Sequence, residues 1–151
     1  TGDTGHYRVI FEAQCAASCT SDKLRLQING ITTLDTYQSV WNGQYLNGSS
    51  ESGSTNDGAA FQSYIRLASR NMYSWGGVLD IFVTPKSDGT NSIAMNYSLS
   101  GVGDATDADS LYTAQGTGRQ NSQTNVTSIK IEADGGNNRD WKVWVLYPAT
   151  S

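Results

Sequence analysis

The sequence predicts an all-β fold, an antiparallel β-sandwich of jelly-roll-like form with about seven or eight strands. Apolar and polar residues alternate with a period of two in segment after segment, which is the pattern of strands with one buried face. No segment sustains the 3.6-residue period of an amphipathic helix, because Gly or Asn interrupts every candidate. The chain has 151 residues, a length typical of one domain, so we predict a single β-sandwich domain over residues 1–151.

The first two predicted strands lie on either side of a cysteine-containing segment. Tyr7–Ala13 and Leu24–Ile28 both alternate apolar with polar residues. We expect them to form a hairpin joined by Cys15–Asp22, since strands adjacent in sequence commonly pair. The dipeptide Asn29-Gly30 follows and is a strong signal for a tight turn.

The next part of the chain, residues 32–58, has no regular strand pattern. Aromatic residues occur there within polar, Gly- and Ser-rich sequence, and Asn47–Asp57 contains almost nothing to bury. We therefore predict a long exposed loop at Asn47–Asp57. Loops of this length within compact domains are uncommon and often have a function.

Further strands are predicted in the second half of the chain. Ile93–Leu99 alternates regularly, and Val78–Thr84 is a nearly continuous apolar run that ends at Pro85. Trp141–Tyr147 has apolar side chains on both faces, which is typical of a central strand. The remaining predicted strands are Ala60–Ala68, Ser110–Ala114 and Val126–Ala133, and the predicted loops are Ser69–Gly77, Gly101–Asp109 and Gly116–Thr124.

Charge and hydropathy exclude two classes of partner. The net charge is −4 and the basic residues are scattered singly, whereas a nucleic-acid-binding module carries a basic patch or stripe. No apolar run is long enough to span a membrane as a helix. We therefore expect no nucleic-acid binding and no membrane insertion. Because the chain starts at Thr1 without Met, we expect a processed product or an excised fragment.

Two cysteines, Cys15 and Cys19, lie close together in the sequence. The alternatives are a structural disulfide, a pair of free thiols and half of a metal site. A redox pair is more usually C-x-x-C, and zinc needs further Cys or His ligands, whereas His6 is the only histidine. We expect a small disulfide between Cys15 and Cys19, with free thiols as the alternative, and such a bond favours an extracellular environment.

Patterns for catalysis and metal binding are weak. His6 is the sole imidazole and no G-x-S-x-G elbow is present, so nucleophilic catalysis lacks its usual base and frame. Glu12 and Glu132, the candidate carboxylates of a glycosidase, are expected on the solvated face of their strands. We therefore expect no enzymatic activity, no cofactor and no metal. The acidic segment Asp104–Asp109 lacks EF-hand spacing, and calcium binding there is left open as the alternative to a solvated loop.

Four aromatic residues lie in segments without a clear strand pattern. Trp41, Tyr45, Tyr73 and Trp75 are flanked by Asn, Gln, Ser and Gly. Exposed rings beside polar side chains suit a saccharide, because sugar C–H faces stack on the ring while the polar groups bind the hydroxyls. We predict that these four residues form a ligand-binding site. The alternatives are rings that close the ends of the sandwich or pack at a subunit interface.

Asn47, Asn96 and Asn125 each begin an Asn-X-Ser/Thr pattern. Such matches arise by chance in a chain rich in these residue types. Glycosylation at Asn96 also requires that this residue lie on an exposed strand face. The sequence alone does not decide whether any of the three sites is glycosylated.

Four short motifs follow one another along the chain: Leu24–Gly30, Tyr37, Thr127–Ile131 and Trp144–Tyr147. Together they resemble a β-sandwich domain of tailed-bacteriophage structural and tail-fibre proteins. The resemblance spans most of the chain, and each motif is only a few residues long. The family pattern often ends in Leu-Tyr-Gly, whereas Pro148 follows here, and the Cys15/Cys19 segment is not a family feature.

The resemblance implies a virion-surface domain, often within a homotrimeric appendage. We expect a tail-fibre or spike head that attaches the particle to a host-cell glycan or receptor, located at the virion surface or outside the cell. The alternative is a secreted lectin or carbohydrate-binding module attached to a polysaccharide-degrading enzyme. In either case binding is non-covalent, and an oligomer multiplies weak contacts through avidity.

Overall fold

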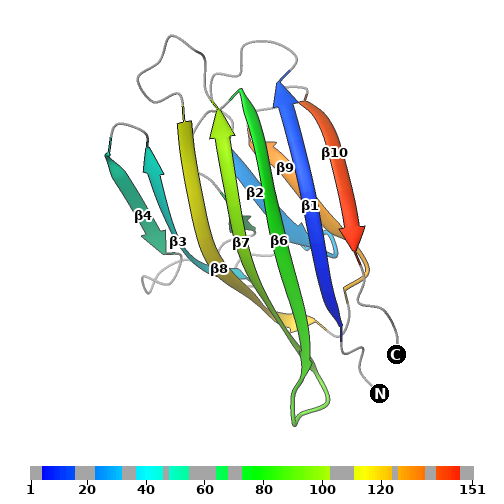
Figure 1. Cartoon of the computed structure of the whole chain (residues 1–151). Coiled ribbons are helices and arrows are strands. Elements are labelled where there is room, and N and C mark those ends of the chain that lie inside the picture. The colour runs from blue at the N-terminus through cyan, green and yellow to red at the C-terminus, as the bar shows by residue number, and fades with distance from the viewer. Residues whose placement is uncertain are drawn as a thin grey trace.

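The computed structural model describes residues 5–15, 23–31, 37–45, 48–54, 64–67, 73–102, 111–123, 126–134 and 139–146. These residues contain ten β-strands and no helix (Figure 1). The all-β prediction is therefore confirmed, with more strands than expected. The strands are β1 (His6–Cys15), β2 (Lys23–Ile28), β3 (Tyr37–Tyr45), β4 (Ser50–Ser54), β5 (Ile65–Arg66), β6 (Ser74–Pro85), β7 (Asn91–Val102), β8 (Leu111–Gln123), β9 (Ile129–Asp134) and β10 (Arg139–Leu146).

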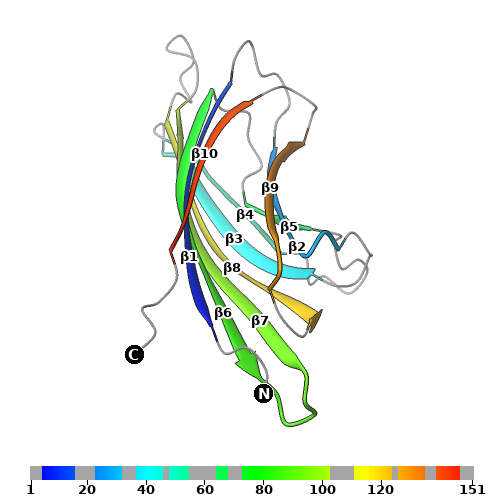
Figure 2. The same cartoon turned by 90° about the vertical axis from the view of Figure 1, so that its right-hand side faces the viewer.

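The strands form two antiparallel sheets. The large sheet has seven strands in the order β10-β1-β6-β7-β8-β3-β4, and the small sheet has three in the order β5-β2-β9. The large sheet is curved, and the small sheet faces its concave side (Figure 2). We call this concave side the inner face of the large sheet and the opposite side its outer face.

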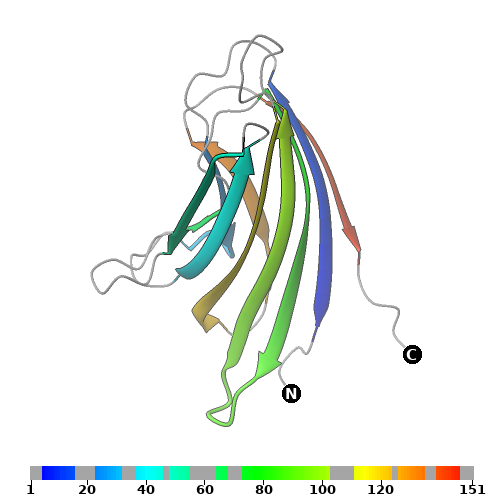
Figure 3. The same ribbon diagram turned by 60° about the vertical axis from the view of Figure 1, so that its left-hand side comes forward.

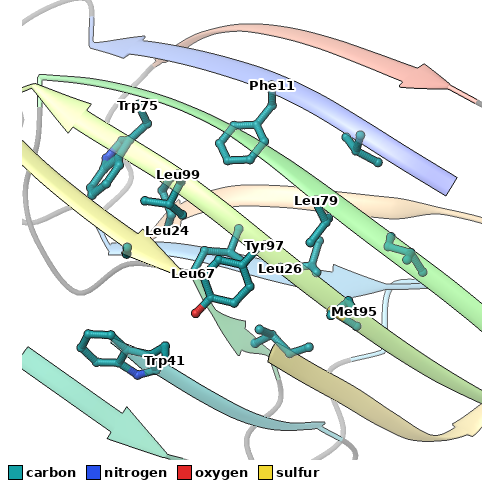
Figure 4. Close-up of a cluster of buried hydrophobic side chains, with 14 of the residues drawn as sticks. Phe11, Leu24, Leu26, Trp41, Leu67, Trp75, Leu79, Met95, Tyr97 and Leu99 are labelled. Carbon is teal, nitrogen blue, oxygen red and sulfur yellow. The ribbon is translucent and has the colours of Figure 1, made fainter. Parts of the chain in front are cut away.

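The hydrophobic core lies between the two sheets (Figure 4). The inner face of the large sheet supplies Phe11, Leu79 and Met95, and the small sheet supplies Leu24 and Leu26, all of which are at most 1% exposed. These residues occupy alternate positions of their strands, so the period of two in the sequence reports which face is buried. Burial of such side chains is the main stabilising contribution to a fold of this kind.

A buried hydroxyl joins the large sheet to the turn after β2. Tyr37 is fully buried, and its Oη accepts a hydrogen bond from Ile28 N at 2.9 Å. The same oxygen lies 3.0 Å from Ile28 O and 3.2 Å from Ile31 O, to which its proton can be donated. Buried backbone polar groups need such partners, so the hydroxyl holds the end of the small sheet against β3.

The predicted turn at Asn29-Gly30 is confirmed. Both residues have positive φ, 56° and 65° respectively, a region that Asn and Gly tolerate better than other residues. The Asn29 carboxamide oxygen accepts hydrogen bonds from Thr127 N at 2.7 Å and Ser128 N at 3.0 Å. One side chain therefore stabilises the turn and fixes the approach to β9.

The predicted hairpin between the first two strands is wrong. β1 lies between β10 and β6 in the large sheet, whereas β2 lies between β5 and β9 in the small sheet. Alternation determines which face of a strand is buried, but it does not determine the neighbour with which the strand pairs. Both segments therefore have the expected faces and belong to different layers.

Three predicted loops are wholly or partly strands. The predicted loop Asn47–Asp57 contains β4, the predicted loop Gly116–Thr124 lies largely within β8, and Ser74–Gly77 belongs to β6. The region of residues 32–58 that lacked a pattern also contains β3. Among the described residues, the predicted strand Ala60–Ala68 is reduced to the two residues of β5. The last strand, predicted to be central, is an edge strand.

Glycines within β8 explain one of these errors. Gly116 packs against the Tyr97 ring, and a Cβ atom at this position would lie 2.5 Å from Tyr97 Oη and 2.6 Å from Val40 O. Gly118 similarly makes room for the Ile65 side chain. Glycine inside a strand commonly marks such a close approach, whereas in the sequence it resembles a turn.

Candidate binding surface

Three of the four predicted binding-site aromatic residues are in the core. Trp41 is 8% exposed, Tyr45 4% and Trp75 2%, and Figure 4 shows the two tryptophans pointing into the space between the sheets. The prediction that these rings are exposed is wrong. A ring needs an open face to stack on a sugar, and these rings instead pack inside the fold, as in the alternative that the sequence left open.

The burial of these rings follows from the register of β3. Its side chains alternate inward and outward, and Trp41 points inward. The cross-strand partners of Trp41 are Gly53 and Gly116, which leave room for the indole on either side. A Cβ atom at Gly53 would lie 2.7 Å from the Trp41 Nε1. Polar and Gly residues between the aromatics hid this alternation in the sequence.

A cluster of rings closes one end of the core. Tyr45 and Tyr112 have ring centroids 4.9 Å apart, and Trp75 meets Tyr112 edge-on at 5.8 Å. These separations and tilts are the ones that aromatic pairs favour. The rings therefore contribute to stability, and the sequence had not identified Tyr112 as their partner.

Tyr73 is the exposed member of the predicted site. It is 46% exposed just before β6, and its hydroxyl lies 3.4 Å from Gln14 Nε2, which donates to it. Gln14 lines a hollow of about 340 Å³ on the outer face, together with Glu12, Asp140 and Lys142. The hollow is charged, and Lys142 Nζ lies 3.7 Å from a Glu12 carboxylate oxygen.

A second hollow lies on the outer face over β7, β8, β3 and β4, and we call it the outer groove. Its cavity volume is about 630 Å³. Among the described residues, the polar side chains that line it are exposed, uncharged hydroxyl or carboxamide groups. They are Asn42, Gln44, Ser50, Ser52, Ser98, Thr113 and Gln115, and Gly43 and Ala114 also line the groove.

The pairing register arranges these side chains in rows across the strands. Ser98, Gln115, Asn42 and Ser52 are successive cross-strand partners. The neighbouring row is Ser100, Thr113, Gln44 and Ser50. Neighbouring strands are about 4.8 Å apart and residues two apart along a strand about 6.8 Å apart, so the outer groove presents a regular array of hydrogen-bonding groups. This array was not predicted from the sequence, because the predicted site consisted of aromatic residues alone.

A charged cluster lies elsewhere on the outer face. Arg8 donates two hydrogen bonds to Asp80, at 2.8 and 2.9 Å, and His6 Nε2 lies 3.0 Å from the same carboxylate. The hydrogen bond from Arg8 lowers the pKa of the Asp80 carboxyl, and the His6 ring stacks on Phe82 at 4.6 Å. This cluster pairs β1 with β6 and contains no nucleophile.

The carboxylates considered for a glycosidase lie in different sheets, Glu12 in β1 and Glu132 in β9. Glu132 pairs with Arg25, 3.3 Å away, and with Lys130. Both contacts are ion pairs within the small sheet. The structure therefore does not bring the two predicted carboxylates together.

Several predicted features lie outside the described residues: Cys19, the Cys15 side chain, Asp104–Asp109, Asn47 and Asn125. Asn96 is described and lies exposed on the outer face. Within the described part of the chain, no three His, Cys, Asp or Glu side chains are grouped so as to hold a metal ion. The same part of the chain contains no helix of the length and apolarity needed to cross a membrane.

Comparison with protein-family models, with curated proteins and with solved structures finds no match for this chain. The geometry and chemistry of the outer face are therefore the basis for a proposed function.

Proposed function

We propose that this chain is a glycan-recognition domain that binds uncharged saccharides along the outer groove. One observation carries the proposal: the groove is lined by exposed hydroxyl and carboxamide side chains, and none of the described residues in its lining is charged. We further propose that the two facing sheets form a jelly-roll-like β-sandwich, and that this domain is the head of a virion appendage that attaches to a host surface.

The chemistry of the lining matches that of sugar hydroxyls. A carboxamide offers two N–H donors and an acceptor oxygen, and a Ser or Thr hydroxyl both donates and accepts. A sugar hydroxyl has the same dual character, so adjacent groups such as Asn42 and Gln115 can bind neighbouring hydroxyls of one residue. An anionic sugar would instead favour a groove with Arg or Lys in its lining.

The shallow form of the groove implies weak binding at each site. Open polar sites compete with water for every hydrogen bond, and the net gain from each is about 0.5–1.5 kcal/mol. A low affinity at each site is sufficient for attachment to a cell surface when several copies bind together. The regular cross-strand rows also favour a second candidate, a carbohydrate-binding module that binds an extended polysaccharide.

A glycan array that contains neutral, sialylated and sulfated glycans tests the proposal. The isolated chain is expected to bind neutral glycans in preference to the anionic ones. The variants Asn42→Ala and Gln115→Ala each remove hydrogen bonds worth about 1.4 kcal/mol, so binding should weaken by about tenfold with an unchanged melting temperature.

Asn96→Ala is the matched control, since Asn96 is an exposed asparagine of the same face outside the groove lining. It should bind glycans like the wild type. Preference for anionic glycans, absence of binding to any neutral glycan, or full binding by both groove variants would contradict the proposal. An oligomer in light scattering would favour the appendage, and a monomer that binds insoluble polysaccharide would favour the module.

A further inference from the structure

β10 is an edge strand with exposed apolar side chains on both faces. Val143 and Val145, on the inner-face side, are 50% and 40% exposed, and Trp144 and Leu146, on the outer-face side, are 45% and 50% exposed. Among the described strands, β1 is the only neighbour of β10 in the large sheet. An apolar edge strand presents both unpaired backbone groups and hydrophobic surface to another chain.

The other edge of the large sheet is built differently. β4 has five residues, Ser-Glu-Ser-Gly-Ser, whereas β10 has eight. Short polar edge strands resist pairing with another chain. Figure 3 shows the two edges on opposite sides of the sheet. The contrast singles out β10 as the edge suited to a partner.

The apolar surface also extends inward from β10. Trp144, Ile10 and Val78 are successive cross-strand partners on the outer face, and Ile10 and Val78 are partly exposed. This apolar strip reaches the edge of the sheet and suits a partner strand with exposed apolar side chains. β10 itself is such a strand.

We propose that β10 pairs with β10 of a second copy, antiparallel about a two-fold axis at Val143, so that the two large sheets become one. A two-fold axis perpendicular to the sheet keeps both outer faces on the same side. It must lie midway between the two copies of one residue, so that outward side chains pair with outward ones. An axis at Lys142 would set two like charges against each other, which is destabilising.

With the axis at Val143, Lys142 lies opposite Trp144 of the second copy, an arrangement suited to a cation–π contact. Trp141 then lies opposite Val145, and Asp140 lies opposite Leu146. An axis at Trp141 would carry Trp144–Leu146 past the start of the partner strand. An axis at Trp144 would also set a charged residue, Lys142, against Leu146, and it would lose the contact between Lys142 and Trp144. The Val143 register therefore covers the apolar part of β10 and keeps the cation–π contact.

The dimer also has a consequence that rests on the proposed function. Both outer grooves would lie on one continuous outer face, so two weak glycan sites could bind the same surface. The dimer itself is tested by mass, so its failure is distinguishable from failure of glycan binding.

The experiment is sedimentation or light scattering of the full chain over a range of concentrations. The wild type should approach twice the monomer mass of 16.3 kDa. Val143→Lys and Val143→Glu each place like charges across the axis and should weaken the dimer by about 100-fold or more. An equimolar mixture of the two variants should recover it, because Lys then faces Glu.

Val40→Lys is the matched control, since Val40 is 57% exposed on the outer face and lies away from β10; it should dimerise like the wild type. Hydrogen exchange of the wild type provides a test that needs no variant: protection of β10 amides, and not of β4 amides, should rise with concentration. A monomer at every soluble concentration, a trimer, a dimer that tolerates Val143→Lys, or no recovery in the mixture would overturn the inference.

Discussion

Replacement of Tyr37 by Phe tests the contact that holds the small sheet against the large one. The ring is fully buried and would remain so, while its hydroxyl, which contacts Ile28 and Ile31, would be lost. Ile28 N would lose its partner, and Ile31 O would lose its contact with the hydroxyl. Ile28 O would retain a bond from Ile31 N at 3.2 Å.

An unsatisfied buried donor or acceptor costs about 1–3 kcal/mol, so we expect Tyr37→Phe to lower the free energy of unfolding by about 2–3 kcal/mol. For a chain of this size that corresponds to a fall in melting temperature of roughly 4–12 °C. Chemical denaturation and calorimetry measure both quantities.

Tyr73→Phe is the control, because Tyr73 is exposed and its hydroxyl makes one long contact at 3.4 Å. Its effect should stay within about 0.5 kcal/mol. Equal stability of Tyr37→Phe and wild type, or equal losses in the two variants, would refute the role assigned to the buried hydroxyl.

Two further predictions concern packing and pH. Gly116→Ala places a Cβ atom against Tyr97 and the Val40 carbonyl and should destabilise the fold by about 1–3 kcal/mol. The control Gly76→Ala, whose Cβ atom would meet nothing closer than 3.9 Å, should be tolerated. Equal denaturation curves for the two variants would contradict this prediction. Burial raises the pKa of both Tyr97 and Tyr37, so the native state holds these protons more tightly than the unfolded state. The titration of these two tyrosines should therefore leave stability unchanged below the ordinary tyrosine pKa of about 10. Above that pH, stability should fall by up to about 1.4 kcal/mol per pH unit for each tyrosine. Tyr97→Phe should make the fall with pH less steep, and an unchanged slope would contradict the raised pKa of Tyr97.

The period-two pattern was sufficient where alternation was regular. β7 alternates without interruption, and its predicted core, Ile93–Leu99, is a strand in the structure. The pattern failed where the inward positions were small or polar. In β8 the inward positions include Gly116, Gly118 and Gln120, whose neighbours supply the bulk that the strand itself lacks.

The pairing of strands could not be read from local sequence. β1 pairs with β6 and β10, whose paired residues lie at least 60 positions further along the chain. Such non-local pairing leaves no trace in a short stretch of sequence. The same limit explains β10: apolar residues on both faces indicated a central strand, whereas the structure places it at an edge. That mismatch is the basis for the proposed dimer.

The exposure of three aromatic residues was mispredicted for a related reason. Aromatic residues among polar ones looked exposed, but the polar neighbours of Trp41 in β3 are the outward residues of the same strand. Those neighbours, Asn42 among them, form the outer groove. The prediction therefore selected the inward residues of β3, whereas the proposed site uses its outward residues.

Glycan binding in the outer groove can be tested by backbone amide NMR during titration with the neutral glycan that the chain binds most strongly on the array. We expect chemical-shift changes to concentrate at Asn42, Ser98, Thr113 and Gln115, on the outer face of the large sheet. Shifts centred on the small sheet or on Tyr73, or no shifts at saturating glycan, would contradict this expectation.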